Sequence, residues 1–189
     1  MMKSIDLMKQ EHQNILVLLD CMQNACCNIL DGCPVEESDF RDMIHIARCY
    51  ADQQHHGKEE QILFRAMTEQ LGSVAVNLIQ HGMLVEHDLG RLHITQLENA
   101  LDEYLADPST KNKLGILAEA TGYANLLKRH IEKEDAAVYT FAERSLPADV
   151  MQDVEQRIET FESDTSASRE ENLLLLEKLA AKYNTENQC

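Results

Sequence analysis

The sequence predicts an all-α protein, an antiparallel up-down-up-down four-helix bundle with a short C-terminal helical appendage. Two observations lead to this prediction. The 189 residues are 44% hydrophobic and include seven Gly, three Pro and 5% aromatic residues, a composition that favours helices over sheets. Turn-forming residues also divide the first 146 residues into four long stretches with short connections. Four long helices joined by short loops pack most economically as an up-down-up-down bundle.

Each predicted helix begins at or near a Ser or Thr that can cap it and ends at a turn containing Gly or Pro. The four helices are expected over residues 4–30, 38–71, 73–107 and 110–146. We therefore assign residues 1–146 to one helical domain that forms the bundle.

The tail, residues 147–189, has a different pattern. Residues 148–163 and 168–183 are each typical of a shorter helix, and a polar stretch from Ser163 to Ser168 lies between them. The tail can pack on the bundle, or its four leucines from Leu173 to Leu176 can form a homodimer contact. We favour packing on the bundle, because short helices gain most of their stability from their own domain.

The charge of the chain excludes several classes of partner. The formal net charge is −16 and the pI is about 4.8, whereas nucleic acids and anionic membranes attract clusters of Lys and Arg. No apolar run approaches the roughly 20 residues of a membrane span, and the first residues lack the apolar core of a signal peptide. The expected location is the cytoplasm, with no nucleic acid and no membrane as partners.

Six polar side chains interrupt apolar rows on the four predicted helices. Residues three and four positions apart lie on the same side of an α-helix, and His12, for example, shares a row with Met8 and Ile15. Such side chains are expected to point into the bundle. The six candidates are His12, His56, Glu60, His87, His130 and Glu134.

One alternative pair has the same spacing as His56 and Glu60. His55 and Glu59 also lie four residues apart, but their row continues through polar residues, among them Arg41, Arg48 and Gln70. This row is typical of a solvent face. We therefore assign the site to His56 and Glu60.

The six candidates also lie at similar heights in the predicted bundle. Measured from the end that holds the loop between helices 2 and 3, His56, His87 and His130 lie roughly 21–24 Å along the axis. Glu60 and Glu134 lie one turn lower. His12 lies about a turn lower again, within the uncertainty of a predicted helix start.

This combination of residue types predicts a metal site. Buried carboxylates without a partner are costly, and the predicted site contains no Lys or Arg to neutralise them, whereas one or two dications would. Imidazole and carboxylate ligands suit iron, manganese or zinc, and carboxylates from two helices suit a dinuclear centre. A lone inward His is usually a core residue and a lone HxxxE pair is usually a surface interaction, but two such pairs with two further His favour a metal.

Four segments of the sequence resemble the hemerythrin-like, or HHE cation-binding, family. They are Glu11-His12, HHGKEEQILFRAM (55–67), MLVEHDLGR (83–91) and HIEKEDAAVYTF (130–141). The resemblance spans about residues 1–146 and implies an antiparallel four-helix bundle around a non-haem di-iron site. It also implies ligand roles: His12 and His56 would bind one iron, His87 and His130 the other, and Glu60 and Glu134 would bridge the two.

The chain departs from the oxygen-carrying members of that family in two motifs. Those proteins have HxxxH in helix 3, where this chain has Met83 in place of the first His, and HxxxxD in helix 4, where this chain has HxxxE. The missing imidazole would leave the second iron more open to water, to Glu86 or to a small ligand. His81 lies about 120° around the helix from His87 and is a poor substitute. The departures argue against reversible oxygen carriage more than against metal binding.

Three functions follow from these expectations. The first is a di-iron protein that binds or senses O₂, NO or peroxide, with two Fe ions as cofactor and Zn or Mn as alternatives. The second is an enzyme that reduces peroxide or NO with electrons from an external donor. The third is a structural or interaction bundle held together by zinc. Catalytic residues are left unassigned.

Overall fold

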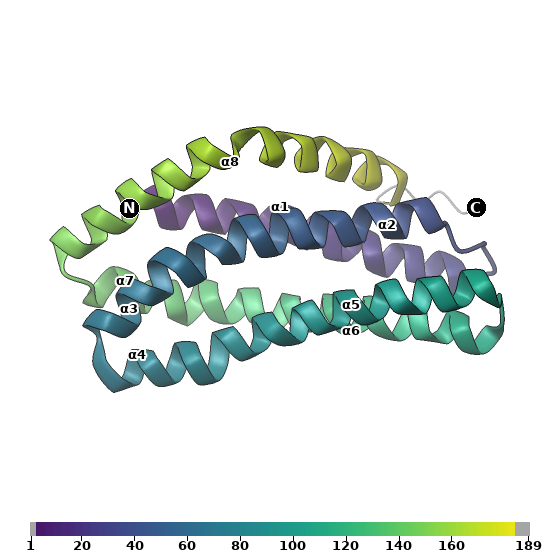
Figure 1. Ribbon diagram of the computed structural model, residues 1–189, viewed down its shortest axis with the longest axis horizontal. Helices are drawn as coiled ribbons and strands as arrows, with labels where there is room; N and C mark the ends of the chain where they lie inside the picture. The colour runs from purple at the N-terminus through teal and green to yellow at the C-terminus, as the bar shows by residue number, and fades with distance from the viewer. Residues whose placement is uncertain (1–2, 184–189) are drawn as a thin grey trace.

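The computed structural model describes residues 3–183, and the described part of the chain is helical without a strand. Five helical rods follow one another along the chain (Figure 1). Some rods contain π-helical segments, labelled η, in which a backbone N–H bonds to the carbonyl five residues earlier. The first rod is α1 (Lys3–Leu30) and the last is α8 (Ala148–Tyr183).

The three middle rods each combine α-helical and π-helical segments. The second rod comprises α2 (Glu37–Ile46), η1 (Ala47–His56), η2 (Glu59–Leu63) and α3 (Phe64–Gln70). The third comprises α4 (Gly72–Leu78), η3 (Ile79–Met83) and α5 (Leu84–Ala106). The fourth comprises α6 (Thr110–Lys133), η4 (Glu134–Val138) and α7 (Tyr139–Ser145). The first four rods begin and end within one residue of the predicted helices.

Local chemistry explains where the rods end. The Ser109 side chain accepts a hydrogen bond from the backbone N–H of Asn112 and so caps α6, which satisfies one of the free donors at a helix start. Gly72, at the turn between the second and third rods, has φ of +69°, a conformation that is strained for other residues. Leu146 is extended before Pro147, as expected for a residue that precedes proline.

The prediction of two short tail helices is wrong, because α8 is one continuous helix from Ala148 to Tyr183. The polar stretch between them contains neither Gly nor Pro. Within it the Thr165 and Ser166 hydroxyls donate to the carbonyl oxygens of Phe161 and Ser163. These side chains are therefore satisfied by the helix itself, which continues through them.

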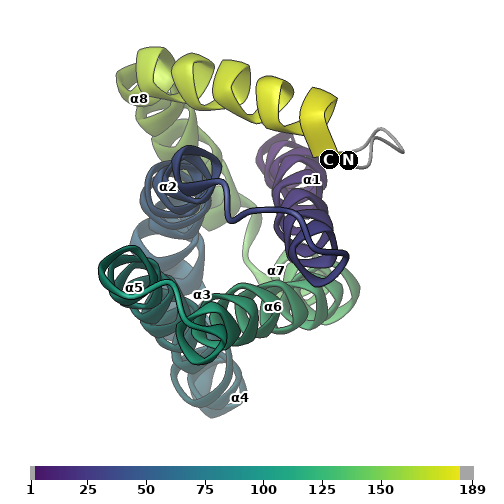
Figure 2. The same cartoon turned by 90° about the vertical axis from the view of Figure 1, so that its right-hand side faces the viewer.

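α8 lies along α1 and the second rod (Figure 2). Its buried apolar residues include Val154, Ile158, Leu176 and Leu179. Of the leucine run, Leu176 is buried and Leu174 is 59% exposed. The helix therefore contributes to the core along much of its length.

The buried apolar residues form two separate clusters. One contains Ile15 on α1 and Ala51 on the second rod, and the other contains Met8 and Ile62 on the same two rods. Between the clusters, each rod carries buried polar side chains instead. A polar layer therefore divides the core partway along the rods.

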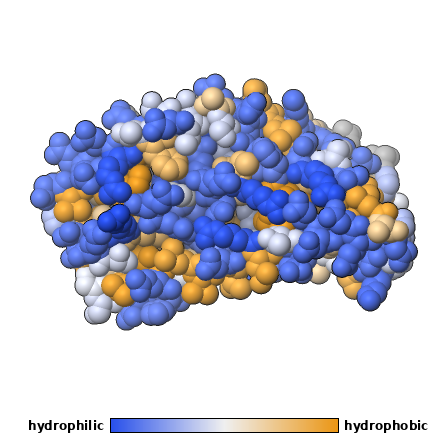
Figure 3. All heavy atoms as spheres, viewed as in Figure 1, coloured by the Kyte–Doolittle hydropathy of each residue, from blue (hydrophilic) through white to orange (hydrophobic). Residues whose placement is uncertain are grey.

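The connections between the rods lie at the two ends of the molecule. In Figure 1 the connections at residues 31–36 and 107–109 lie at one end, and those at Leu71 and at residues 146–147 lie at the other. Figure 3 shows a largely hydrophilic face with an apolar band along its lower edge. Among the described residues, no helix is both long enough and apolar enough to span a membrane.

Candidate metal centre

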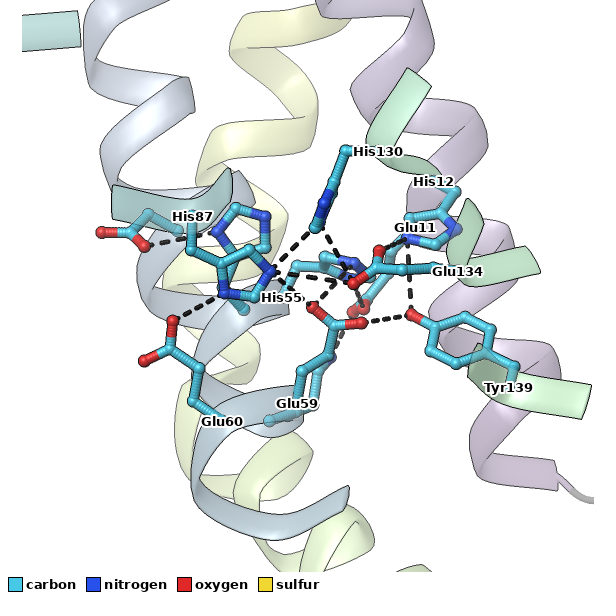
Figure 4. A network of polar contacts seen from close by, with 12 residues as sticks. Glu11, His12, His55, Glu59, Glu60, His87, His130, Glu134 and Tyr139 are labelled. Carbon is cyan, nitrogen blue, oxygen red and sulfur yellow. Dashed lines mark hydrogen bonds and ion pairs between the residues drawn. The ribbon is translucent and has the colours of Figure 1, made fainter. Parts of the chain in front are cut away.

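Five histidine side chains meet in the polar layer, and all are buried. His12 comes from α1, His55 and His56 from η1, His87 from α5 and His130 from α6, and their exposures range from 0 to 4%. Figure 4 shows His12, His55, His87 and His130 directed toward Glu59 and Glu134. The first four rods thus all contribute to one site.

Each imidazole is held by a carboxylate at its Nδ1 atom. The Nδ1 contacts are His12 to Asp135 at 2.8 Å, His55 to Glu11 at 2.8 Å, His56 to Asp52 at 3.4 Å, His87 to Glu60 at 2.7 Å and His130 to Glu86 at 3.0 Å. A carboxylate can only accept, so we assign a proton to every Nδ1. In a neutral ring this leaves the Nε2 lone pair free for a metal, the arrangement found around metal-binding histidines.

Two carboxylates occupy the middle of the site, and both are fully buried. One oxygen of Glu134 lies 3.1 Å from His130 Nε2 and the other lies 3.2 Å from His12 Nε2. Glu59 Oε2 lies 3.6 Å from His87 Nε2 and 3.7 Å from His55 Nε2. Each carboxylate therefore lies between imidazoles on opposite sides of the site.

The donor atoms form two overlapping groups that could each hold a metal ion. The three-imidazole group contains His56, His87, His130 and Glu59, and the two-imidazole group contains His12, His55, Glu59 and Glu134. Within each group the donor atoms all lie within 4.8 Å of one another. Because Glu59 belongs to both groups, its carboxylate is placed to bridge two ions.

The electrostatics of this centre also fit bound cations. Among the described residues, Glu59 Oε2, both Glu134 oxygens and His55 Nε2 are buried without a hydrogen-bond partner, which is costly in the absence of a ligand. Burial, with repulsion from Glu134, raises the pKa of Glu59 well above 4.5. Burial also acts to raise the pKa of Glu134, but its attraction to His130, His12 and His87 outweighs burial and lowers the pKa well below 4.5. The residues therefore fit one or two dications.

The assignment of Glu60 to the centre, and of His55 and Glu59 to a solvent face, does not agree with the structure. His55 and Glu59 are 1% and 0% exposed, whereas the Glu60 side chain is 27% exposed. Glu60 accepts from His87 Nδ1 and from Arg91, so its carboxylate lies behind the imidazole (Figure 4). The structure brings together the other five predicted residues and adds His55 and Glu59.

The π-helical segments explain this error. Rows of residues three and four apart assume α-helical turns, but η1 and η2 occupy the second rod on both sides of Gly57. A π-turn holds more residues than an α-turn, so the faces of the residues before and after it are no longer in phase. The polar row used to place His55 outside began at Arg41, ahead of η1. π-Turns are rare, and those within α-helices are frequently found at functional sites.

The adjacent histidines also account for the missing imidazole of helix 3. Met83 is 3% exposed and belongs to an apolar cluster. The resemblance pairs His56 with His12, but the His56 ring stacks on that of His87 with centroids 3.8 Å apart and takes the place of the missing imidazole, while His55 joins His12. The HH pair at positions 55 and 56 was the sequence signal for this arrangement, because η1 turns both rings inward.

Cations lie nearer to the site than the sequence suggested. Lys58 is fully buried and pairs with Glu11, and Arg91 lies 2.7 Å from both Asp52 and Glu60. These cations bind the carboxylates that hold the imidazoles. Among the described residues, Glu59 and Glu134 form their ion pairs with histidines.

Two further features complete the surroundings of the centre. The Tyr139 hydroxyl donates to Glu59 Oε1 at 2.6 Å and lies 3.4 Å from His12 Nε2. A cavity of about 240 Å³ borders His56 and His87, with Arg91 and Tyr123 also in its wall. The cavity has room for a small molecule beside the three-imidazole group.

The remaining histidines lie outside the centre, as expected. His45 and His81 are exposed. His93 contacts Glu119 at 2.8 Å.

The chain matches a known protein family over most of its length. The family described as "Hemerythrin HHE cation binding domain" matches residues 3–142. Neither a curated protein nor a solved structure matches the chain. The matched range includes all the residues of both donor groups and excludes α8.

Proposed function

Because the chain belongs to the hemerythrin HHE cation-binding family, we propose that it holds two iron ions and binds or senses O₂, NO or peroxide. The supporting fold is an antiparallel four-helix bundle formed by the first four rods, with α8 packed along one side as a fifth helix. Cation binding follows from the family and from the two donor groups.

The observation that carries the proposal is the set of five buried imidazoles around two carboxylates. Every Nδ1 is engaged by a carboxylate, and the Nε2 atoms face inward with Glu59 and Glu134. His56, His87 and His130 would hold one ion, and His12 and His55 the other. Glu59 and Glu134 would be shared by the two ions. The donor set lacks cysteine, and nitrogen with carboxylate oxygen suits iron, with manganese and zinc as alternatives.

Iron bound in such a centre would supply electrons to a small oxidant, or would bind NO. The protein's own residues keep the site dry and hold each imidazole in one tautomer. Tyr139 supplies a neutral hydroxyl at the centre, since burial and the neighbouring Glu59 raise the pKa of its phenol well above 10. The small cavity beside His56 and His87 supports a ligand of a few atoms.

Elemental analysis with absorption spectroscopy tests the proposal. Protein purified without oxygen is expected to contain two irons per chain and to gain near-ultraviolet absorption when air is admitted. A colourless protein that contains zinc and does not respond to air would refute the iron proposal and favour a structural bundle. Consumption of peroxide or NO beyond one equivalent per site, with reductant present, would identify a reductase.

A matched pair of variants links the metal to the site. His56→Ala is expected to lose the ion of the three-imidazole group, because it removes one of three imidazoles. His45→Ala lies on the same rod with an exposed side chain, and its metal content should equal that of the wild type. Equal losses in both variants would contradict the assignment.

A further inference from the structure

A fully buried lysine joins α8 to the metal centre. The Lys58 ammonium donates to Glu11 Oε1 and to Glu162 Oε1. Lys58 is 0% exposed, Glu11 is 2% exposed and Glu162 is 9% exposed. A buried ammonium is stable only when it is paired, and here two carboxylates share one ammonium.

The geometry of α8 brings Glu162 to this lysine. Gly57, the residue before Lys58, lies so close to α8 that a Cβ atom there would be 3.4 Å from Phe161 Cζ. Phe161 precedes Glu162, whose second oxygen accepts from Arg169, about two turns further along the helix. Glu162 is therefore held from α8 on one side and by Lys58 on the other.

Glu11, which pairs with Lys58, also contacts a candidate metal ligand. Glu11 Oε2 accepts from His55 Nδ1 at 2.8 Å, so one carboxylate joins Lys58 to His55. Two other cations pair with carboxylates that hold an imidazole, and both are more exposed than Lys58. Arg91 pairs with Glu60 and Lys133 with Glu86, and their side-chain exposures are 38% and 51%. The contacts of His55 thus differ from those of His87 and His130, because its carboxylate partner binds a buried cation that also pairs with a helix outside the family match.

We propose that Glu162 of α8 is a positioning residue that acts through Lys58 and Glu11 on His55, and that α8 thereby tunes the metal affinity of the two-imidazole group. Glu162 draws the ammonium away from Glu11, which leaves Glu11 a stronger acceptor for the His55 N–H. A stronger acceptor makes His55 Nε2 a better ligand. The inference rests on the proposed metal binding, and its test separates the two.

The experiment is an anaerobic titration of metal-free protein with Fe²⁺, read by equilibrium dialysis and iron analysis. The variants are Glu162→Gln, Arg169→Gln and, as a matched control, Glu171→Gln, an exposed glutamate on the same helix. Glu162→Gln keeps the shape of the side chain and removes its charge, so Lys58 then pulls on Glu11 alone. We expect the ion of the two-imidazole group, called the second iron here, to bind up to about 10-fold more weakly, because Glu162 acts one contact beyond Glu11, the direct partner of the ligating histidine. The ion of the three-imidazole group, the first iron, should bind as in the wild type.

Arg169→Gln should act in the opposite direction. Without Arg169, the Glu162 carboxylate interacts with Lys58 alone, which weakens the attraction between Lys58 and Glu11. The second iron should therefore bind at least as tightly as in the wild type. Glu171→Gln should change neither step. The ¹⁵N shifts of the His55 ring in metal-free protein give a second readout, and they should change in Glu162→Gln and stay constant in Glu171→Gln.

The outcomes separate the two proposals. A wild-type protein that binds no iron refutes the proposed function, whereas two irons in both wild type and Glu162→Gln with equal affinities refute only the role of Glu162. Equal weakening of both steps in Glu162→Gln, with a lower Tm, would show general loosening and overturn the inference. Should Glu162→Gln fail to fold, Arg169→Gln carries the test alone, and a weaker second step in that variant overturns it.

Discussion

At the scale of single residues, the centre depends on what each polar group contacts more than on its position in the sequence. Glu59 and Glu60 are adjacent and chemically identical, yet one lies between the two donor groups and the other accepts from His87 Nδ1 and Arg91. The first is placed to neutralise cations directly. The second orients an imidazole, a role that affects affinity less than the loss of a ligand.

This difference gives a matched prediction. Glu59→Gln removes a charge from the shared position of both groups and should lose most of the bound metal. Glu60→Gln should retain both ions, with an affinity lowered by roughly tenfold because only the partner of His87 is changed. Iron analysis after dialysis against a weak chelator measures both. Greater metal loss in Glu60→Gln than in Glu59→Gln would favour the original assignment of Glu60.

At the scale of helices, π-turns and a fifth helix determine how the side chains meet. η1 and η2 occupy the second rod around Gly57, and α8 approaches the rod at that glycine. Gly57 itself has an ordinary helical conformation, with φ of −57° and ψ of −41°. Its small size therefore matters for the approach of α8, while its backbone freedom does not.

Substitutions at Gly57 should reveal the close approach of α8. Gly57→Ala gains helix propensity, about 1 kcal/mol, against a contact of 3.4 Å with Phe161, so its Tm should lie near that of the wild type. Gly57→Leu must displace Phe161 and should destabilise the protein by about 1–3 kcal/mol. Thermal unfolding by circular dichroism measures both changes.

Gly82 provides the control for this pair. Gly82 lies within the π-helical segment η3, whereas Gly57 lies between η1 and η2, and a Cβ added at Gly82 would have no neighbour within 4 Å. Gly82→Leu should therefore leave the Tm within a few degrees of the wild type. Equal destabilisation by leucine at both glycines would show that π-turns, rather than α8, disfavour the side chain.

At the scale of the whole molecule, the polar layer links the binding of metal to the stability of the fold. It separates two apolar clusters and leaves buried acceptors without a hydrogen-bond partner among the described residues. A ligand that binds only the folded state stabilises it. The layer should therefore be the least stable part of the metal-free core.

Removal of metal should lower the Tm by roughly 5–15 °C, the shift expected when metal is present at 100 to 1,000 times its Kd.

The gap in Tm between iron-loaded and metal-free protein should also widen with rising pH. Burial disfavours a charged His12, but hydrogen bonds to Asp135 and Glu134 outweigh burial and raise its pKa to about 9, from 6.5. Protonated His12 therefore stabilises the metal-free fold fully below pH 6.5, and this contribution is lost as the pH rises through 9.

Metal binding responds to pH in the opposite sense, because a metal must displace the His12 proton and so binds more tightly as the pH rises. Scanning calorimetry of metal-free and iron-loaded protein between pH 6.5 and 9.5 measures the gap. A gap that is constant or narrows with rising pH would contradict the predicted role of the His12 proton.

The sequence by itself determined the all-helical class, the ends of the first four rods to within one residue, and the burial of His12, His56, His87, His130 and Glu134. These features depend on local signals: caps, Gly and Pro turns, and apolar rows within regular helices. The tertiary structure alone decided that Glu59 and His55 enter the site, that Glu60 stands behind His87, and that a buried Lys58 ties α8 to Glu11. The reason is physical, since π-turns shift the phase of a helix in response to what it packs against, and no local propensity records that shift.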